Sequence, residues 1–188
     1  AFIAQTGDTV RFPDDTALRD AIRSKPIYDI ILRKERLADL LWDLELATRT
    51  KFSVQTQRPS SMSIEHVLPR TWTTHWPLAD GRSVAADKVT GADEAMLAGI
   101  RERDALLHTF GNLTLVTVPA NSVASNSAFS TKKQWLMQSL LALNLEVCKG
   151  ETWDVGEIGV RSEVLADRAI KIWPHPDAPE LSLAKRTA

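Results

Sequence analysis

The chain has 188 residues, 44% of them hydrophobic and 25% charged, and its formal net charge is −1. This is the composition of an ordinary globular domain, and the near-neutral charge counts mildly against a nucleic-acid-binding module, because such modules are often basic overall. The single cysteine, Cys148, excludes a disulfide framework and a cysteine-based zinc site. No apolar run approaches the roughly 18–20 residues of a membrane span, so we expect a cytoplasmic protein without a membrane partner.

The first fifty residues predict a helical arm. Asp14 or Asp15 is placed to cap a first helix that carries Leu18 and Ile22 on its apolar face, and Pro26 should end or bend it. From residue 30 to 50, leucines recur at helical spacing and are better explained as core than as a ligand site.

The pattern changes after about residue 51, where strand and loop signals begin. Residues 63–68 read as a strand, 92–109 as a helix, and 110–118 as a second short strand stopped by Pro119. Helical spacings return over 127–147 and over 153–173. Two strands alone are marginally stable, so the helices must supply most of the core. We therefore expect an α+β, mostly helical fold.

We expect one domain over residues 1–188. It divides into a helical arm (1–50), a strand-containing core (51–145) and a C-terminal helical segment (146–188). The chain does not begin with Met, and we expect it to be the C-terminal part of a longer protein.

Glu65 and His66 stand side by side at the end of the first strand. Neighbouring strand residues normally point to opposite faces, but near a strand end both groups can reach one metal or one water. Alone, this dipeptide is a weak signal. Further polar residues follow in the second half of the chain: Asn112 opens the second strand, and Asn121 and Asn126 come after Pro119.

The order "IEHVLP", "HTFGNLTLV" and an Asn nine positions after Asn112 resembles the HNH, or ββα-metal, endonuclease motif. The longer stretches "IEHVLPRTW", "FGNLTLV", "ANSVASNSAFSTKKQWL" and "IGVRSEVLADRAIKIW" resemble the C-terminal nuclease domain of GmrSD-type modification-dependent restriction enzymes and of SspE-type anti-phage proteins. The resemblance covers residues from about 16 to 174. It implies a ββα-metal core within the helical domain.

The resemblance, together with the chemistry of phosphodiester cleavage, implies a division of roles. His66 is the candidate general base, since a neutral imidazole can take a proton from water at neutral pH. Glu65 and the amide oxygen of Asn121 would hold a hard divalent cation, most readily Mg²⁺ with Mn²⁺ as an alternative. Asn126 is a second candidate for the amide ligand.

By the family pattern, Asn112 ties the segment between the strands and fixes the backbone around His66. Lys132 and Lys133 would begin the following helix, where they either contact DNA phosphates or form a solvated face. His108 would be a phosphate ligand, a partner of the site residues or a structural histidine.

The resulting hypothesis is a metal-dependent DNA endonuclease that nicks or cuts foreign DNA in a restriction or anti-phage system. Family resemblance implies an N-terminal NTPase-like regulatory domain and a target that is either phage DNA with modified bases or DNA entering a phosphorothioate-marked host. Two alternatives stay open, namely a non-catalytic DNA- or protein-docking domain and a metal-dependent RNase.

Overall fold

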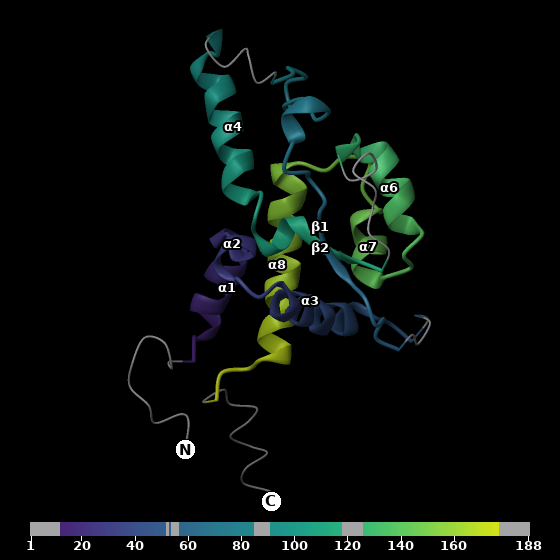
Figure 1. Cartoon of the computed structure of the whole chain (residues 1–188). Helices are drawn as coiled ribbons and strands as arrows, with labels where there is room; N and C mark the ends of the chain where they lie inside the picture. The colour runs from purple at the N-terminus through teal and green to yellow at the C-terminus, as the bar shows by residue number, and fades with distance from the viewer. Residues whose placement is uncertain (1–11, 52, 54–56, 85–90, 118–125, 177–188) are drawn as a thin grey trace, which may run out of the picture.

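The computed structural model describes residues 12–51, 53, 57–84, 91–117 and 126–176. Within these ranges the chain is mostly helical and carries one small sheet (Figure 1). The elements in chain order are α1 (Asp15–Ser24), α2 (Ile27–Ile30), α3 (Lys34–Thr48), β1 (Ser63–His66), the 3₁₀ turn η2 (Trp72–Thr74), α4 (Glu94–Leu106), the 3₁₀ turn η4 (Phe110–Asn112), β2 (Leu113–Val116), α6 (Phe129–Met137), α7 (Ala142–Val147) and α8 (Val155–Ile172). The α+β, mostly helical prediction is confirmed.

The sheet consists of β1 and β2 paired antiparallel. His66 lies opposite Leu113, and Glu65 lies opposite Thr114. Because η4 runs directly into β2, the end of β1 that carries His66 lies beside Asn112. The register therefore brings the two sequence motifs together.

Local signals explain the first helices well. The Asp14 carboxylate accepts a hydrogen bond of 2.8 Å from the backbone N–H of Ala17, which is the predicted N-cap. Helix α1 ends at Ser24, and Pro26 stands at the N-terminus of the short helix α2. The C-terminal helix α8 is fixed by a capping box between Asp154 and Glu157.

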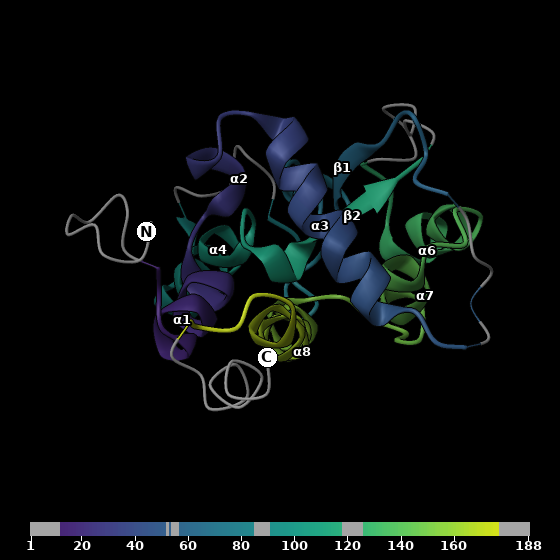
Figure 2. The same cartoon turned by 90° about the horizontal axis from the view of Figure 1, so that it is seen from below.

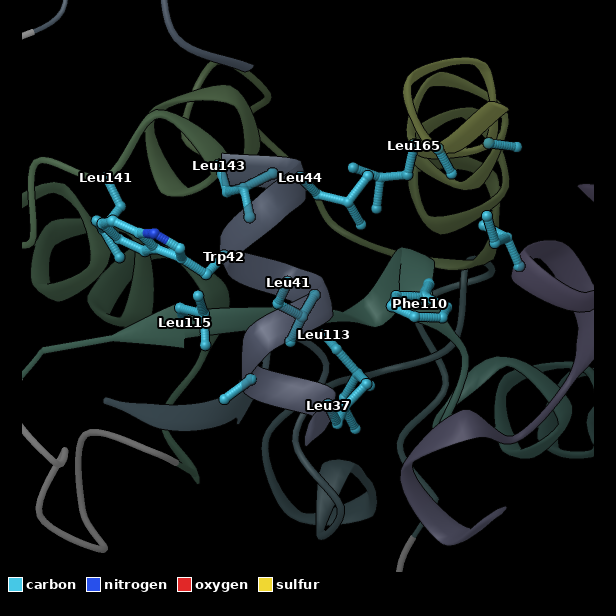
Figure 3. Packing of buried hydrophobic residues seen from close by; sticks show 14 residues of the cluster. Leu37, Leu41, Trp42, Leu44, Phe110, Leu113, Leu115, Leu141, Leu143 and Leu165 are labelled. Carbon is cyan, nitrogen blue, oxygen red and sulfur yellow. The ribbon is translucent and has the colours of Figure 1, made fainter. Parts of the chain in front are cut away.

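The first hydrophobic cluster joins the two ends of the chain across the sheet. Figure 3 shows Leu44 of α3 directed toward Leu165 of α8, while Leu41 and Leu37 of α3 lie against β2 near Leu113. Leu113 and Leu115 of β2 and Leu165 of α8 belong to the same cluster, and each of these six leucines is fully buried. The helices thus supply most of the core, as a two-stranded sheet requires.

A second cluster covers the segment that follows β1. Val67 and Leu68 pack there with Trp72, Trp76 and residues of α6 and α8. Trp72 and Trp76 are 2% and 6% exposed, so both indoles pack inside the fold. The backbone just beyond His66 is therefore held from both sides.

The helical pattern over residues 127–147 is split into two helices. Helix α6 ends at Met137, and the backbone turns at Leu140, whose φ of 54° is left-handed and whose side chain is exposed. The buried carboxylate of Glu45 accepts hydrogen bonds from the backbone N–H groups of Ala142 (3.1 Å) and Leu143 (2.8 Å), so a residue of α3 caps α7.

Within the part of the chain that the structure describes, none of the helices combines the length and the apolar character needed to cross a bilayer.

Candidate active site

His66 ends β1 and is buried, with 6% of its surface exposed. Its Nε2 lies 3.0 Å from Nδ1 of His108, so the two imidazoles share a hydrogen bond. The ring of Tyr28 in α2 packs edge-on against His66, with centroids 4.6 Å apart, and stacks on His108 at 5.7 Å. The ring that β1 carries is thus contacted by a residue of α2 and by a residue of the loop after α4.

The surroundings of His66 favour its neutral form. Burial, first of all, and then electrostatic interactions with His108, Arg70, Lys132 and Lys34 lower the pKa of His66 from 6.5 to about 3. The ring is therefore uncharged at neutral pH and has a nitrogen lone pair that can accept a proton.

Glu65 pairs with a buried lysine from α6. The ammonium of Lys132 lies 2.7 Å from Oε1 of Glu65, and it also donates a hydrogen bond to the backbone carbonyl of His66. The Lys132 side chain is fully buried, and burial lowers its pKa while Glu65 raises it. This pair binds α6 to the end of β1.

The burial of Lys132 corrects the expectation that it contacts DNA phosphates. Two adjacent lysines at a helix start suggest a solvated face, but the depth of Lys132 is set by its approach to Glu65, which is far away in the sequence. The ammonium of its neighbour Lys133 lies 2.9 Å from the carbonyl oxygen of Gly150 and 3.0 Å from Glu151. Phosphate contact by Lys133 stays a prediction.

Asn112 is fully buried and clamps the backbone that follows His66. Its Oδ1 accepts a hydrogen bond from the Leu68 N–H at 2.7 Å, and its Nδ2 donates to the carbonyl oxygens of Leu68 and Leu107, each at 2.9 Å. The indole of Trp153 adds a bond of 3.2 Å to the same Oδ1. These bonds hold residues 67–68, as the positioning role of Asn112 requires.

The backbone on either side of Asn112 is also held by α8. The Arg161 guanidinium donates to the carbonyl oxygens of Gly111 (2.8 Å) and Leu113 (2.7 Å). At Gly111 the two segments approach so closely that an added β-carbon would lie 2.5 Å from the carbonyl oxygen of Ile158. Only glycine fits this contact.

The structure describes only some of the candidate metal ligands. Asn121 lies outside the described residues, and Asn126 accepts a hydrogen bond of 2.8 Å from the hydroxyl of Thr71. Among the residues described, no three His, Cys, Asp or Glu side chains cluster as metal ligands would. Glu65 is a hard oxygen ligand of the type that Mg²⁺ prefers, but a cation there must share or replace the contact with Lys132.

Sequence reasoning missed Tyr28, Asp29 and Lys34. Tyr28 contacts both histidines, and Asp29 Oδ2 lies 3.9 Å from Nε2 of His108. The Lys34 ammonium lies 4.0 Å from the centroid of the Tyr28 ring. The one available signal was that Tyr28 is the single tyrosine of the chain; no periodicity links it to His66.

Comparison with known proteins gives one clear result. No curated protein matches the chain. The family model described as "GmrSD restriction endonucleases, C-terminal domain" matches residues 12–168, which is most of the chain and includes all of the site residues named above. The chain therefore belongs to the family of GmrSD restriction endonuclease C-terminal domains.

Proposed function

We propose that this domain is a metal-dependent DNA endonuclease whose ββα core consists of β1, β2 and α6, and whose general base is His66. Family membership supports nuclease activity with DNA as the substrate. The observation that carries the proposal is the neutral, buried ring of His66 at the end of β1, with Glu65 directly before it in the strand. A base and an oxygen ligand at adjacent positions are what hydrolysis of a phosphodiester needs.

The tautomer of the histidine pair follows from this role. If Nε2 of His66 donates its hydrogen to Nδ1 of His108, the lone pair on Nδ1 of His66 is left to accept a proton from the attacking water. Nε2 of His108 then carries a hydrogen and faces the carboxylate of Asp29 at 3.9 Å. The Asp29 carboxylate then supplies a negative charge on the far side of His108 when His66 takes the proton.

The remaining residues position the base. Asn112 and Lys132 hold the backbone that follows the His66 ring, Lys132 through the His66 carbonyl and Asn112 through Leu68. Tyr28 covers the ring face and limits the approach of bulk water. These contacts support a fixed orientation of the base before substrate binds.

Mg²⁺ or Mn²⁺ held by Glu65 together with Asn121 or Asn126 would stabilise negative charge on the scissile phosphate and on the leaving oxygen. We also propose that the full-length protein carries an N-terminal NTPase-like domain, that it acts in the cytoplasm, and that its target is modified or phage DNA.

The test is a plasmid-nicking assay with wild type and His66→Ala, in Mg²⁺, in Mn²⁺ and in chelator. We expect nicking by the wild type with a divalent metal and a loss of at least about 100-fold in His66→Ala, in line with the contribution of a general base. Equal nicking by both proteins, or cleavage that persists in chelator, contradicts the proposal. Absence of DNA cleavage with strong binding supports the docking alternative, and cleavage of RNA but not DNA supports the RNase alternative.

A further inference from the structure

Most surface arginines in the described part of the chain are neutralised by carboxylates. Examples are Arg19–Glu163, Arg23–Glu163, Arg58–Asp39, Arg82–Asp93 and Arg101–Glu94. Arg33, Arg36 and Arg70 are exposed and form no ion pair with any described residue. Guanidinium groups left without an acidic partner on a near-neutral protein are candidates for binding an external anion.

Arg70 and Lys34, the latter the chain neighbour of Arg33, both lie close enough to His66 to lower its pKa. Arg70 follows His66 closely in the chain, and its charge contributes to the lowered pKa of that histidine. Arg33 and Arg36 flank Lys34, whose ammonium donates to the carbonyl oxygens of Tyr28 and Ile31, the latter at 3.0 Å. Since Tyr28 packs on His66, the start of α3 is fastened beside the site; Figure 2 shows α2 next to it.

The surface between α2 and α3 is hollowed. A depression of about 740 Å³ is lined by Arg33 and Arg36 together with exposed aliphatic side chains such as Leu32. Asp39 also lines it, but its carboxylate pairs with Arg58, so its negative charge is offset. A hollow of this kind can receive backbone phosphates next to Arg33 and Arg36.

We propose that Arg33, Arg36 and Arg70 form the surface that binds the phosphate backbone of the DNA substrate, a role that sequence analysis gave to Lys132 and Lys133. The inference rests on the proposed endonuclease function. The carboxylates of Asp29 and Glu35 lie on the same segment and reduce the local positive charge. We therefore expect two or three phosphate contacts, and a correspondingly modest dependence of affinity on salt.

The experiment measures binding of a fluorescent DNA duplex by anisotropy, in chelator, over a series of salt concentrations. Each phosphate contact contributes about −0.9 to the slope of log Kobs against log salt concentration. We expect Arg33→Gln/Arg36→Gln to make this negative slope shallower by about 1.8 and to lower the affinity at low salt by about tenfold, and Arg70→Gln to make the slope shallower by about 0.9. Arg101→Gln, an exposed and ion-paired arginine of α4, is the matched control.

The outcomes separate this inference from the proposed function. His66→Ala should bind DNA as the wild type does, because its ring is buried and contacts no backbone phosphate in our account. If the Arg33, Arg36 and Arg70 variants show the same salt dependence as Arg101→Gln while the wild type still nicks DNA, these arginines do not bind the phosphates. The endonuclease function is then unaffected. If these variants lose DNA binding but neither they nor the wild type nick DNA, the phosphate-binding role of the arginines is supported and the endonuclease function is refuted.

Discussion

Nε2 of His66 lies 3.0 Å from Nδ1 of His108, and these residues are 42 positions apart in the chain. The contact joins the end of β1 to the loop after α4, and the stacked ring of Tyr28 covers His108 while its edge meets His66. Two imidazoles that face each other through one hydrogen cannot both carry protons on the facing nitrogens. The contact therefore fixes the orientation of the His66 ring.

The first prediction concerns stability at acid pH. The pKa of His66 is about 3 in the folded protein and near its ordinary 6.5 in the unfolded chain. Between these pH values the unfolded chain binds a proton that the folded one does not, so the free energy of unfolding falls as pH is lowered, by at most about 1.4 kcal/mol per pH unit. Urea unfolding in chelator should show this slope in the wild type.

His66→Gln removes the titrating group. Between about pH 6 and about pH 4, the slope of the free energy of unfolding against pH should therefore be smaller in this variant, by up to the amount that one bound proton contributes. The comparison uses slopes, so a constant loss of stability in the variant does not affect it. An unchanged slope in His66→Gln would show that His66 titrates normally in the folded protein.

The second prediction concerns the buried pair of Glu65 and Lys132. Removing one partner leaves the other charge buried and unpaired, and such changes lower the free energy of unfolding by about 3–5 kcal/mol. We expect Glu65→Gln and Lys132→Met each to lower the free energy of unfolding by about 3 kcal/mol. The double variant should lose clearly less than the sum, with a coupling energy of about 1–3 kcal/mol.

Lys133→Met is the matched control for this cycle, because Lys133 is the adjacent lysine and pairs with the exposed carboxylate of Glu151. Lys133→Met should lower the free energy of unfolding by no more than about 1 kcal/mol. Strict additivity of Glu65→Gln and Lys132→Met would refute the coupling between them.

The third prediction concerns Asn112→Ala. The change leaves the Leu68 N–H and the carbonyl oxygens of Leu68 and Leu107 without their side-chain partner in a buried setting. Each unsatisfied group costs about 1–3 kcal/mol, so we expect a total loss of at least about 3 kcal/mol in urea unfolding. A loss below about 1 kcal/mol would mean that Asn112 does not hold this segment.

The fourth prediction compares two glycines near α8. A β-carbon at Gly111 would overlap the Ser162 hydroxyl and the Ile158 carbonyl, so Gly111→Ala should lower stability by about 1–3 kcal/mol. Gly159 lies inside α8 with nothing within 4 Å of an added β-carbon, so Gly159→Ala should raise stability by about 0.5–1 kcal/mol. Thermal unfolding of both variants tests the pair, and equal effects would contradict the close contact.

Features that depend on local sequence were predicted well. The Asp14 cap, the stop before Pro26 and the leucine spacing of α3 all act within a turn or two of the chain. The short strands at Glu65–His66 and after Asn112 were also recognised, because their flanking turn residues are close by.

Features that depend on distant contacts were not predictable in this way. Lys132 is buried because Glu65, 67 positions earlier, meets its ammonium, and α7 begins where Glu45 of α3 caps it. Tyr28 reaches His66 because α2 folds back over the loop that carries His108, whose carbonyl oxygen accepts a hydrogen bond from the Tyr28 N–H at 3.1 Å. No spacing rule connects such pairs.

The most direct test of the central claim is the single-turnover rate of DNA cleavage by His66→Ala and the wild type in Mg²⁺, with the DNA affinity of both proteins measured in chelator. If His66 is the general base, the rate falls by at least about 100-fold while the affinity is unchanged. A rate within about twofold of the wild type at equal affinity would contradict the account, because the proton would then leave the attacking water by a route that does not involve His66.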